Sequence, residues 1–263
     1  MRFACTSQIV RPTFEHSRVL VPLPSYLSDS SSQLSSFEHQ KNLRHFIANL
    51  ANQQLPNSQT YPPLSKMSTR PRLPKGSTIL VTGVTGYIGS WVAYEALALG
   101  YKVRGAVRSL EKAAWLQEHF DSEFGSGQYS QAVLADVSDK AGFEAVVRDV
   151  VGIAHIAVNT QLSSDPEPYI PQAIEETLMV LKAAQTERSV ASVVLTSSSM
   201  AAVAWGASGT IPKDAYNEEF IKLAWDSSFE HPAKMFYVYG AAKAQAEKAA
   251  WYVTPCHPVV VEH

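Results

Sequence analysis

Short apolar runs alternate with longer segments of helical periodicity from residue 77 onward. The apolar runs, which are typical of buried strands, lie at residues 78–82, 102–107, 131–135, 150–157 and 192–196. Helical patterns cover residues 90–99, 169–187 and 237–251. The first of these helices is expected to bury Ile88, Val92, Ala96 and Leu99 and to stop at Gly100. Because strands that alternate with helices pair in parallel, the pattern predicts an α/β protein with a doubly wound parallel sheet.

A glycine-rich turn joins the first expected strand to the first expected helix. A glycine suits the tight turn, a second allows phosphates to approach the main chain, and a third allows the helix to pack closely on the strand. Main-chain N–H groups at a helix N-terminus bind pyrophosphate, so the sequence predicts a Rossmann-type, dinucleotide-binding fold. The expected contacts of the turn with the dinucleotide are Gly83, Thr85, Gly86, Tyr87, Ile88 and Gly89.

The second strand ends in a basic residue where NAD sites carry an acidic one. Arg108 follows this strand, 25 residues after Gly83, and Lys112 comes one helical turn later. An acid at this place binds the ribose 2′-hydroxyl of NAD, whereas a cation suits the 2′-phosphate of NADP. The two side chains could also be ordinary solvated cations. The missing acid favours NADP(H) as the cofactor.

The ends of the third and fourth strands carry polar residues of less specific meaning. Asp136 and Val137 follow the third strand, where the adenine amino group could be bound. An Asp at this place can equally cap the next helix. His155 lies inside the apolar run of the fourth strand, so we expect a hydrogen-bonded core residue without a chemical role.

The candidate catalytic residues lie after the fifth strand and on the last helix. The strand ends in Ser197-Ser198-Ser199, and about forty residues later Tyr239 and Lys243 stand four apart on a strong helical pattern. Residues four apart share one face of a helix. An ammonium group this close favours a phenolate over a phenol, which suits a tyrosine that donates a proton to a carbonyl oxygen.

From Lys75 to Trp251 the chain resembles the extended short-chain dehydrogenase/reductase family, whose members are NAD-dependent epimerase/dehydratase-like. The resemblance rests on the glycine turn, the strand end Thr196-Ser197-Ser198 and the Tyr239-x-x-x-Lys243 pair, in this order. Residues 103–108 and 243–251 are similar to the branch of dihydroflavonol 4-reductase and the fungal aldehyde and ketone reductases.

The resemblance implies NADPH-dependent reduction of an aldehyde or ketone to an alcohol. It implies Tyr239 as the general acid, and Lys243 as the residue that assists Tyr239 and binds the nicotinamide ribose. Ser198 would polarise the carbonyl, with Ser197 and Ser199 as alternatives. Dehydratases of this superfamily usually carry an acidic pair after the strand-end serine, and this chain lacks it, which disfavours sugar dehydration.

The first 74 residues differ in composition from the rest of the chain. Residues 1–75 hold nine Lys and Arg against three acids (+6), whereas residues 76–263 hold 13 against 21 (−8), which together give the net charge of −2. All 13 glycines lie from Gly76 onward, and eight of the 15 prolines lie before it. We therefore interpret residues 1–74 as a disordered extension and residues 75–263 as the NAD(P)-binding domain.

Composition excludes several classes of partner. The chain has no apolar run of the ~18 residues that cross a membrane, no basic excess for nucleic acid and no cysteine pattern for a metal. Arginines near the N-terminus resemble a mitochondrial presequence, but Glu15 and two prolines weaken its amphipathic helix. We expect a cytoplasmic protein, with mitochondria as the alternative, and a small-molecule carbonyl compound as its partner.

The resemblance also implies further strands and a substrate-binding region after the helix that carries Lys243. Only twelve residues follow Trp251, and residues 259–261 could form at most a stub of a sixth strand. We therefore expect a C-terminally truncated domain that lacks most of the substrate-binding region and exposes the edge of the fifth strand. The alternative function is a non-catalytic NAD(P)-binding protein of the same family. Arg108 argues against a third possibility, an NAD-dependent epimerase.

Overall fold

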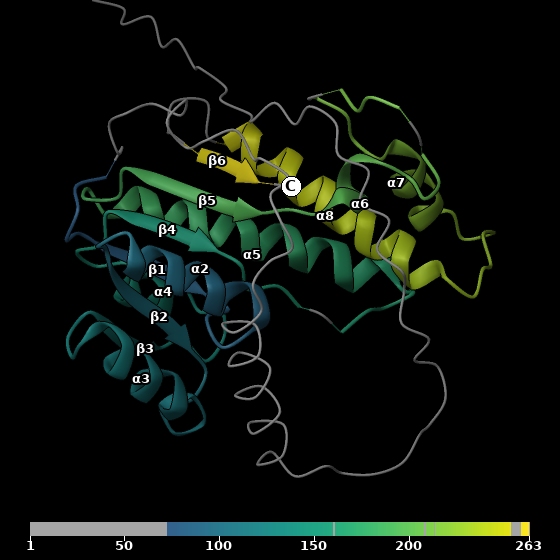
Figure 1. The fold of residues 1–263 in the computed structure, drawn as a ribbon. Helices are drawn as coiled ribbons and strands as arrows, with labels where there is room; N and C mark the ends of the chain where they lie inside the picture. Colours follow the sequence, from purple (N-terminus) through teal and green to yellow (C-terminus); the bar gives the residue numbers. More distant parts are fainter. Residues whose placement is uncertain (1–72, 160, 208, 213, 254–258, 263) are drawn as a thin grey trace, which may run out of the picture. The chain divides into compact units, whose positions relative to one another are not determined.

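Six parallel strands form one sheet in the order β3-β2-β1-β4-β5-β6, and helices cover both faces (Figure 1). The computed structural model describes residues 73–159, 161–207, 209–212, 214–253 and 259–262. In this order the chain reverses its direction of strand addition between β1 and β4, as in doubly wound α/β proteins. The predicted fold class is confirmed. The extension predicted at residues 1–74 lies almost entirely outside the described residues, and its boundary with the domain stays a prediction.

The central strands are the most deeply buried. The strands are β1 (Thr78–Thr82), β2 (Lys102–Val107), β3 (Tyr129–Val133), β4 (Gly152–His155), β5 (Ser192–Thr196) and β6 (Val259–Glu262). Leu80 of β1 pairs with Arg104 of β2 on one side and with Ile153 of β4 on the other. Both Leu80 and Ile153 are buried, as expected for strands covered on two faces.

Two strands differ in their bounds from the prediction. β3 begins at Tyr129 and ends at Val133, two residues before the predicted start and end, because Tyr129 is buried and packs edge-on against Phe120 whereas Val133 is exposed. β4 begins at Gly152, two residues after the predicted start, and ends at His155, two residues before the predicted end. There the Oγ1 of Thr82 accepts hydrogen bonds from the main-chain N–H groups of Ile156 and Ala157, both at 3.0 Å, which draws the chain out of the ladder.

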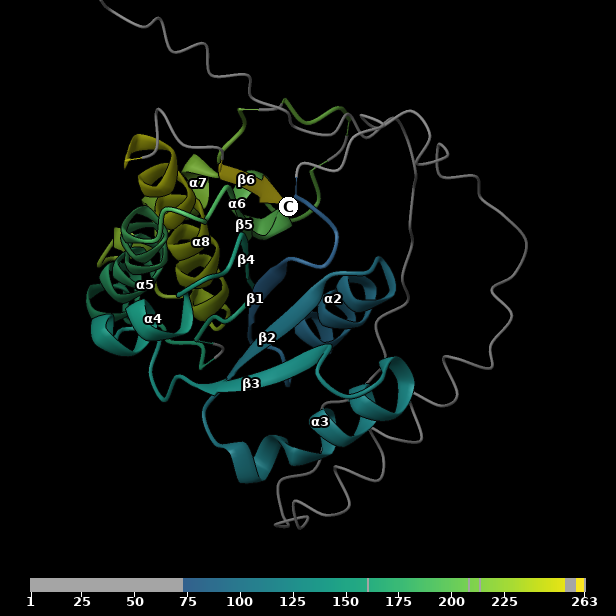
Figure 2. The same cartoon turned by 90° about the vertical axis from the view of Figure 1, so that its left-hand side faces the viewer.

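Helices lie in two layers, one on each face of the sheet (Figure 2). The helices are α2 (Tyr87–Ala98), α3 (Leu110–Phe124), α4 (Lys140–Val146), α5 (Pro166–Thr186), α6 (Ser199–Ala202), α7 (Glu218–Trp225) and α8 (Lys234–Val253). α2 and α3 pack on one face through a cluster that includes Ala93 and Phe120. α4, α5 and α8 pack on the other face through a cluster that includes Phe143 and Leu181.

The buried face of α2 is rotated from the predicted one, so that of the four expected residues Ala96 is buried and Val92 is half-buried. Its buried residues are Gly89, Ala93, Ala96 and Leu97, whereas Ile88 and Leu99 are 52% and 55% exposed. The helix begins at Tyr87, directly after Gly86. Its small side chains face the sheet because they let the first turn approach the main chain of the glycine turn, and this turns Ile88 outward.

The edge of β5 is paired over four of its five residues. β6 forms a parallel ladder with β5 from Val193↔Val259 to Thr196↔Glu262. The predicted stub of a sixth strand is therefore present as four residues. The expectation that the edge of β5 is exposed was wrong, because this short strand satisfies the main-chain groups of that edge.

Candidate active site

The strands bring the predicted site residues to one edge of the sheet. Because all six strands are parallel, the segments that follow them leave from the same edge. Gly83 follows β1, Arg108 follows β2, Asp136 lies three residues after β3, and Ser197 follows β5. The reversal of strand order between β1 and β4 forms the crevice in which open α/β sheets bind their ligands.

The glycine turn fits closely against its surroundings. Gly83 has a φ of 66°, and a Cβ there would lie 2.9 Å from the main-chain N of Ala157, so the position requires glycine. A Cβ on Gly89 would overlap the main-chain O of Gly83. Among the described residues no side chain caps the N-terminus of α2. The N-terminus of a helix carries a partial positive charge that favours an anion.

The two predicted cations lie on the segment next to this turn. β1 and β2 are neighbours in the sheet, so Arg108 leaves the sheet beside Gly83. Ser109 caps α3 by accepting a hydrogen bond from the N–H of Lys112 (3.4 Å), which places Lys112 in the first turn. Both cations are exposed, and their contact with a 2′-phosphate stays a prediction.

Asp136 forms a local turn rather than a helix cap. Its Oδ1 accepts a hydrogen bond from the N–H of Ser138 at 2.8 Å, and this bond holds the pKa of the carboxyl below its ordinary value. The N-cap position of α4 is Asp139, so the alternative role predicted for Asp136 was wrong. Val137 packs against the core. Contact of either residue with adenine stays a prediction.

Tyr239 and Lys243 line one small cavity at the carboxyl edge of the sheet. Three elements form it: the end of β4 with the following loop, the first half of α5, and α8. The lining residues are Val158, Asn159, Tyr169, Gln172, Ala173, Glu176, Tyr239, Ala242 and Lys243. The two residues that the sequence places on one helix face therefore line the same cavity, and their catalytic roles stay a prediction.

Two buried groups of α5 share this cavity, and sequence reasoning missed both. The hydroxyl of Tyr169 donates to the main-chain O of Asn159 (2.9 Å), and burial raises its pKa. Glu176 is only 6% exposed and accepts a hydrogen bond from Nε2 of Gln172 at 2.8 Å. Burial raises the pKa of Glu176, although the bond from Gln172 lowers it.

Lys243 ties α8 to the end of β5. Its Nζ donates to the main-chain O of Thr196 at 2.7 Å, two residues before Ser198. Burial lowers the pKa of Lys243, whereas the negative charge of Glu247, one turn further along α8, raises it. The ammonium group is thus held at the strand end by a bond that leaves two of its three N–H groups for other partners.

The three strand-end serines have different partners. Ser197 donates from Oγ to Oε2 of Glu247 (2.8 Å). Ser198 is the N-cap of α6, and its Oγ accepts from the N–H of Met200 (3.2 Å). This bond uses a lone pair of Ser198 and leaves its O–H as a donor. Ser199 is exposed.

His155 is a core residue, as expected. The hydroxyl of Thr82 already accepts two main-chain N–H groups, so it donates its proton to Nδ1 of His155 (2.9 Å). Burial, with a smaller contribution from the charge of Lys243, lowers the pKa of His155 to about 3. The imidazole is therefore neutral at physiological pH.

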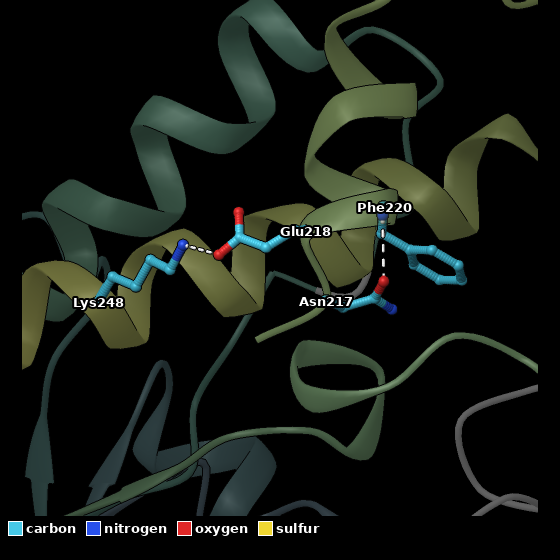
Figure 3. Close-up of polar contacts among 4 residues, drawn as sticks. All are labelled: Asn217, Glu218, Phe220 and Lys248. Atoms are coloured by element: carbon cyan, nitrogen blue, oxygen red, sulfur yellow. Dashed lines mark hydrogen bonds and ion pairs between the residues drawn. The ribbon is translucent and has the colours of Figure 1, made fainter. Parts of the chain in front are cut away.

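α7 is anchored to the segment that carries Ser198 through Asn217, and to α8 through Glu218, whose ion pair with Lys248 is drawn in Figure 3. Asn217 is buried; its Oδ1 accepts from the N–H of Phe220 (3.1 Å) and its Nδ2 donates to the main-chain O of Met200 (3.0 Å). Glu218 forms an ion pair with Lys248 of α8. The turn after β5 is thus fixed from the side of α7, and sequence reasoning missed this contact because the linked residues are far apart in the chain.

Comparisons with known proteins agree with this geometry. The model of the NAD dependent epimerase/dehydratase family matches residues 79–257. The NAD-dependent epimerase/dehydratase terH of Aspergillus terreus is 40% identical over 181 residues, which cover 68% of this chain and 53% of that protein. Aldehyde reductase 2 of Sporidiobolus salmonicolor is 36% identical over 189 residues, with the same coverage.

A solved structure shows the same fold. Gre2 of Candida albicans in complex with NADPH superimposes with a TM-score of 0.59 at 26% identity, over 70% of this chain and 56% of that one. The chain spans about half the length of the curated relatives it matches.

Fold and site together define a Rossmann-type α/β protein whose Tyr-x-x-x-Lys pair lines a cavity at the carboxyl edge of the sheet. The chain belongs to the NAD dependent epimerase/dehydratase family, and the predicted resemblance is confirmed. Among the described residues no helix has both the length and the apolar character to cross a membrane. The same residues contain no cluster of three or more His, Cys, Asp or Glu side chains that could bind a metal.

Proposed function

We propose that this chain binds NADP(H) and supplies the catalytic residues that reduce an aldehyde or ketone to an alcohol. The observation that carries the proposal is the shared cavity of Tyr239 and Lys243 at the carboxyl edge of the sheet. The similarity to an aldehyde reductase and to a reductase in complex with NADPH supports both the reaction class and the cofactor.

The residues at the edge of the sheet fit this cofactor. Gly83 and Gly89 leave no room for side chains between the turn and α2, so main-chain N–H groups meet the pyrophosphate. Arg108 and Lys112 would offer two cations to the 2′-phosphate, and Asp136 would contact the adenine. One N–H group of the Lys243 ammonium donates to the O of Thr196, and the other two would donate to the nicotinamide ribose.

When bound, NADPH supplies the hydride that adds to the carbonyl carbon. Tyr239 donates its phenolic proton to the carbonyl oxygen, so that the carbon gains the hydride and the oxygen the proton. The ammonium of Lys243 stabilises the phenolate that remains, and solvent later returns a proton to it. Ser198 donates a hydrogen bond to the same carbonyl oxygen.

The hydrogen bonds of the strand end favour Ser198 over its neighbours as the group that polarises the carbonyl. The hydroxyl of Ser197 already donates its hydrogen bond to Glu247. Ser199 is exposed in the first turn of α6. Ser198 uses its oxygen as an acceptor and keeps its proton for a substrate. This role for Ser198 is part of the proposal.

The experiment combines cofactor binding with turnover. NADPH is titrated into the purified chain by fluorescence, and the loss of NADPH absorbance is then followed with a panel of aliphatic and aromatic aldehydes and ketones. We expect binding and turnover in the wild type, and binding without turnover in Tyr239→Phe. Absence of NADPH binding would refute the proposal.

The alternative is a family member that binds the nucleotide without turnover. It shares the glycine turn and Arg108 with the reductase, and it differs in having no turnover of a carbonyl compound. Binding of NADPH with no turnover of any carbonyl compound by the wild type would favour it.

A further inference from the structure

Glu247 is a buried carboxylate directly behind the catalytic pair. It is 4% exposed and lies one turn after Lys243 on α8, which puts the side chains of Tyr239, Lys243 and Glu247 along one face of the helix. Its Oε2 accepts a hydrogen bond from Oγ of Ser197 (2.8 Å), and its Oε1 accepts one from Nε1 of Trp251 (3.4 Å). The burial of a carboxylate costs free energy unless the carboxylate is hydrogen-bonded and near an opposite charge.

We propose that Glu247 is a positioning residue that fixes the strand-end serines against α8 and maintains the positive charge of Lys243. The inference deepens the proposed function and rests on it for the roles of Tyr239 and Ser198. The two effects come from one side chain, but they have different causes and are separable by experiment.

The first effect is geometric. α8 is tied to the end of β5 by two hydrogen bonds of opposite direction: Lys243 donates to the O of Thr196, and Ser197 donates to Glu247. The bonded residues are consecutive on the strand, and Ser198 follows at once. A loss of the bond from Ser197 frees the segment that carries Ser198 to shift away from Tyr239.

The second effect is electrostatic. Burial lowers the pKa of Lys243, and the charge of Glu247 opposes this effect. Four other titratable groups face the ammonium or its cavity: Tyr239 from α8, Tyr169 and Glu176 from α5, and His155 from β4. Of these, His155 is neutral, and burial raises the pKa of both Tyr169 and Glu176. Glu247 is therefore the carboxylate on which the charge of Lys243 depends most.

Three variants separate the two effects. Glu247→Gln keeps an oxygen that accepts from Ser197 but removes the charge. Ser197→Ala removes the hydrogen bond but keeps the charge. Glu218→Gln is the matched control, because it removes a carboxylate that pairs with a lysine of the same helix, Lys248, at the protein surface.

The decisive measurement is the pH titration of Lys243 by NMR in lysine-labelled protein, with the signal assigned through Lys243→Arg. We expect Glu247→Gln to move the midpoint of Lys243 downward, and Ser197→Ala and Glu218→Gln to leave it at the wild-type value. An unchanged midpoint in Glu247→Gln, or an equal shift in Glu218→Gln, would overturn the electrostatic part. This readout does not depend on turnover, so it decides the role of Glu247 even if the proposed function fails.

Kinetics then test the geometric part. We expect Ser197→Ala to lower kcat at least tenfold with an unchanged pH profile. Glu247→Gln should instead move the alkaline limb of the profile to lower pH, because Lys243 loses its charge earlier. A kcat of Ser197→Ala equal to that of the wild type would overturn the geometric part. Whether the wild-type protein turns over a carbonyl compound is a separate result, which tests the proposed function.

Discussion

Gly89 lies so close to the main-chain oxygen of Gly83 that a Cβ on Gly89 would overlap this oxygen. This contact brings the first turn of α2 onto the end of β1 and thereby sets the position of the helix N-terminus in the crevice. Gly89→Ala should therefore destabilise the domain by about 3 kcal/mol, since overpacking against main chain cannot relax by a rotamer change. The expected drop in the thermal midpoint is roughly 6–12 °C.

Gly86→Ala is the matched control within the same turn. A Cβ on Gly86 would lie 3.3 Å from the O of Gly83, a tight contact that a small shift relieves. We expect a change in stability of less than about 1 kcal/mol, but an NADPH affinity reduced at least tenfold, because the added methyl group stands where the phosphates approach. Calorimetry and fluorescence titration give the two values. Equal destabilisation by both substitutions would contradict this division of roles.

The cofactor preference depends on the cations after β2. Arg108 and Lys112 are exposed beside the glycine turn, where NAD sites place an acid. NADPH should bind at least tenfold more tightly than NADH, a difference of about 1.4 kcal/mol, and Arg108→Ala should remove most of it by weakening NADPH alone. Titration of both nucleotides into both proteins measures this. Equal affinities in the wild type would show that the cations are merely solvated.

Asn217 and Glu218 are neighbours with very different expected contributions to stability. Asn217→Ala leaves two main-chain groups, the O of Met200 and the N–H of Phe220, without their partner, which typically costs about 2 kcal/mol. Glu218→Ala removes an exposed ion pair with Lys248, which is worth about 0–1 kcal/mol. Denaturant unfolding of both variants compares them. A larger loss in Glu218→Ala would show that the surface pair anchors α7.

The bounds of three strands could be predicted from the sequence, whereas those of β3 and β4 could not. β1, β2 and β5 have the predicted bounds because each coincides with a short run rich in apolar residues, which suits a sheet covered on both faces. β3 lies at the edge of the sheet and only its first residue, Tyr129, is buried, so its apolar run does not mark its start. The predicted buried face of α2 differs from the observed one because the closest contact of the helix with the end of β1 is made by Gly89 and not by an apolar side chain.

The parts of the site that lie within one short sequence motif could be predicted from the sequence. The glycine turn and the pair Tyr239 and Lys243 are local patterns, and the structure brings each to the predicted edge. Ser197 and Glu247 are 50 residues apart, and Asn217 and Met200 are 17 apart, so only the tertiary fold shows their contacts. The spacing of four from Lys243 to Glu247 is a signal that could have indicated a shared face.

Glu176 should make stability depend on pH. Burial raises its pKa in the folded state, so its protonated form contributes stability that is fully present below the unfolded-state pKa of about 4.3 and is lost as pH rises through the folded-state pKa. Glu176→Gln stays neutral and still offers an oxygen to Gln172. The variant should gain in thermal midpoint over the wild type at pH 8 and much less at pH 4.

The neighbouring Glu175 gives the control for this pH dependence. It is exposed on the same helix, so Glu175→Gln should follow the wild-type curve of thermal midpoint against pH. Parallel curves for the wild type and Glu176→Gln would show that the carboxyl of Glu176 is solvated in the folded chain.

The assignment of the proton donor separates turnover from cofactor binding. Tyr239→Phe removes only the hydroxyl, so NADPH should bind within about twofold of the wild type, while carbonyl reduction should fall by at least the 10²–10⁴-fold that a general acid contributes. Lys243→Ala should reduce both, because its ammonium serves the tyrosine and the ribose and its bond to Thr196 holds α8 on β5. Single-turnover kinetics with pre-bound NADPH distinguish the two losses. If Tyr239→Phe retained turnover, the proton would have to come from another group of the cavity, and Tyr169, whose hydroxyl is held by Asn159, would be the next residue to replace.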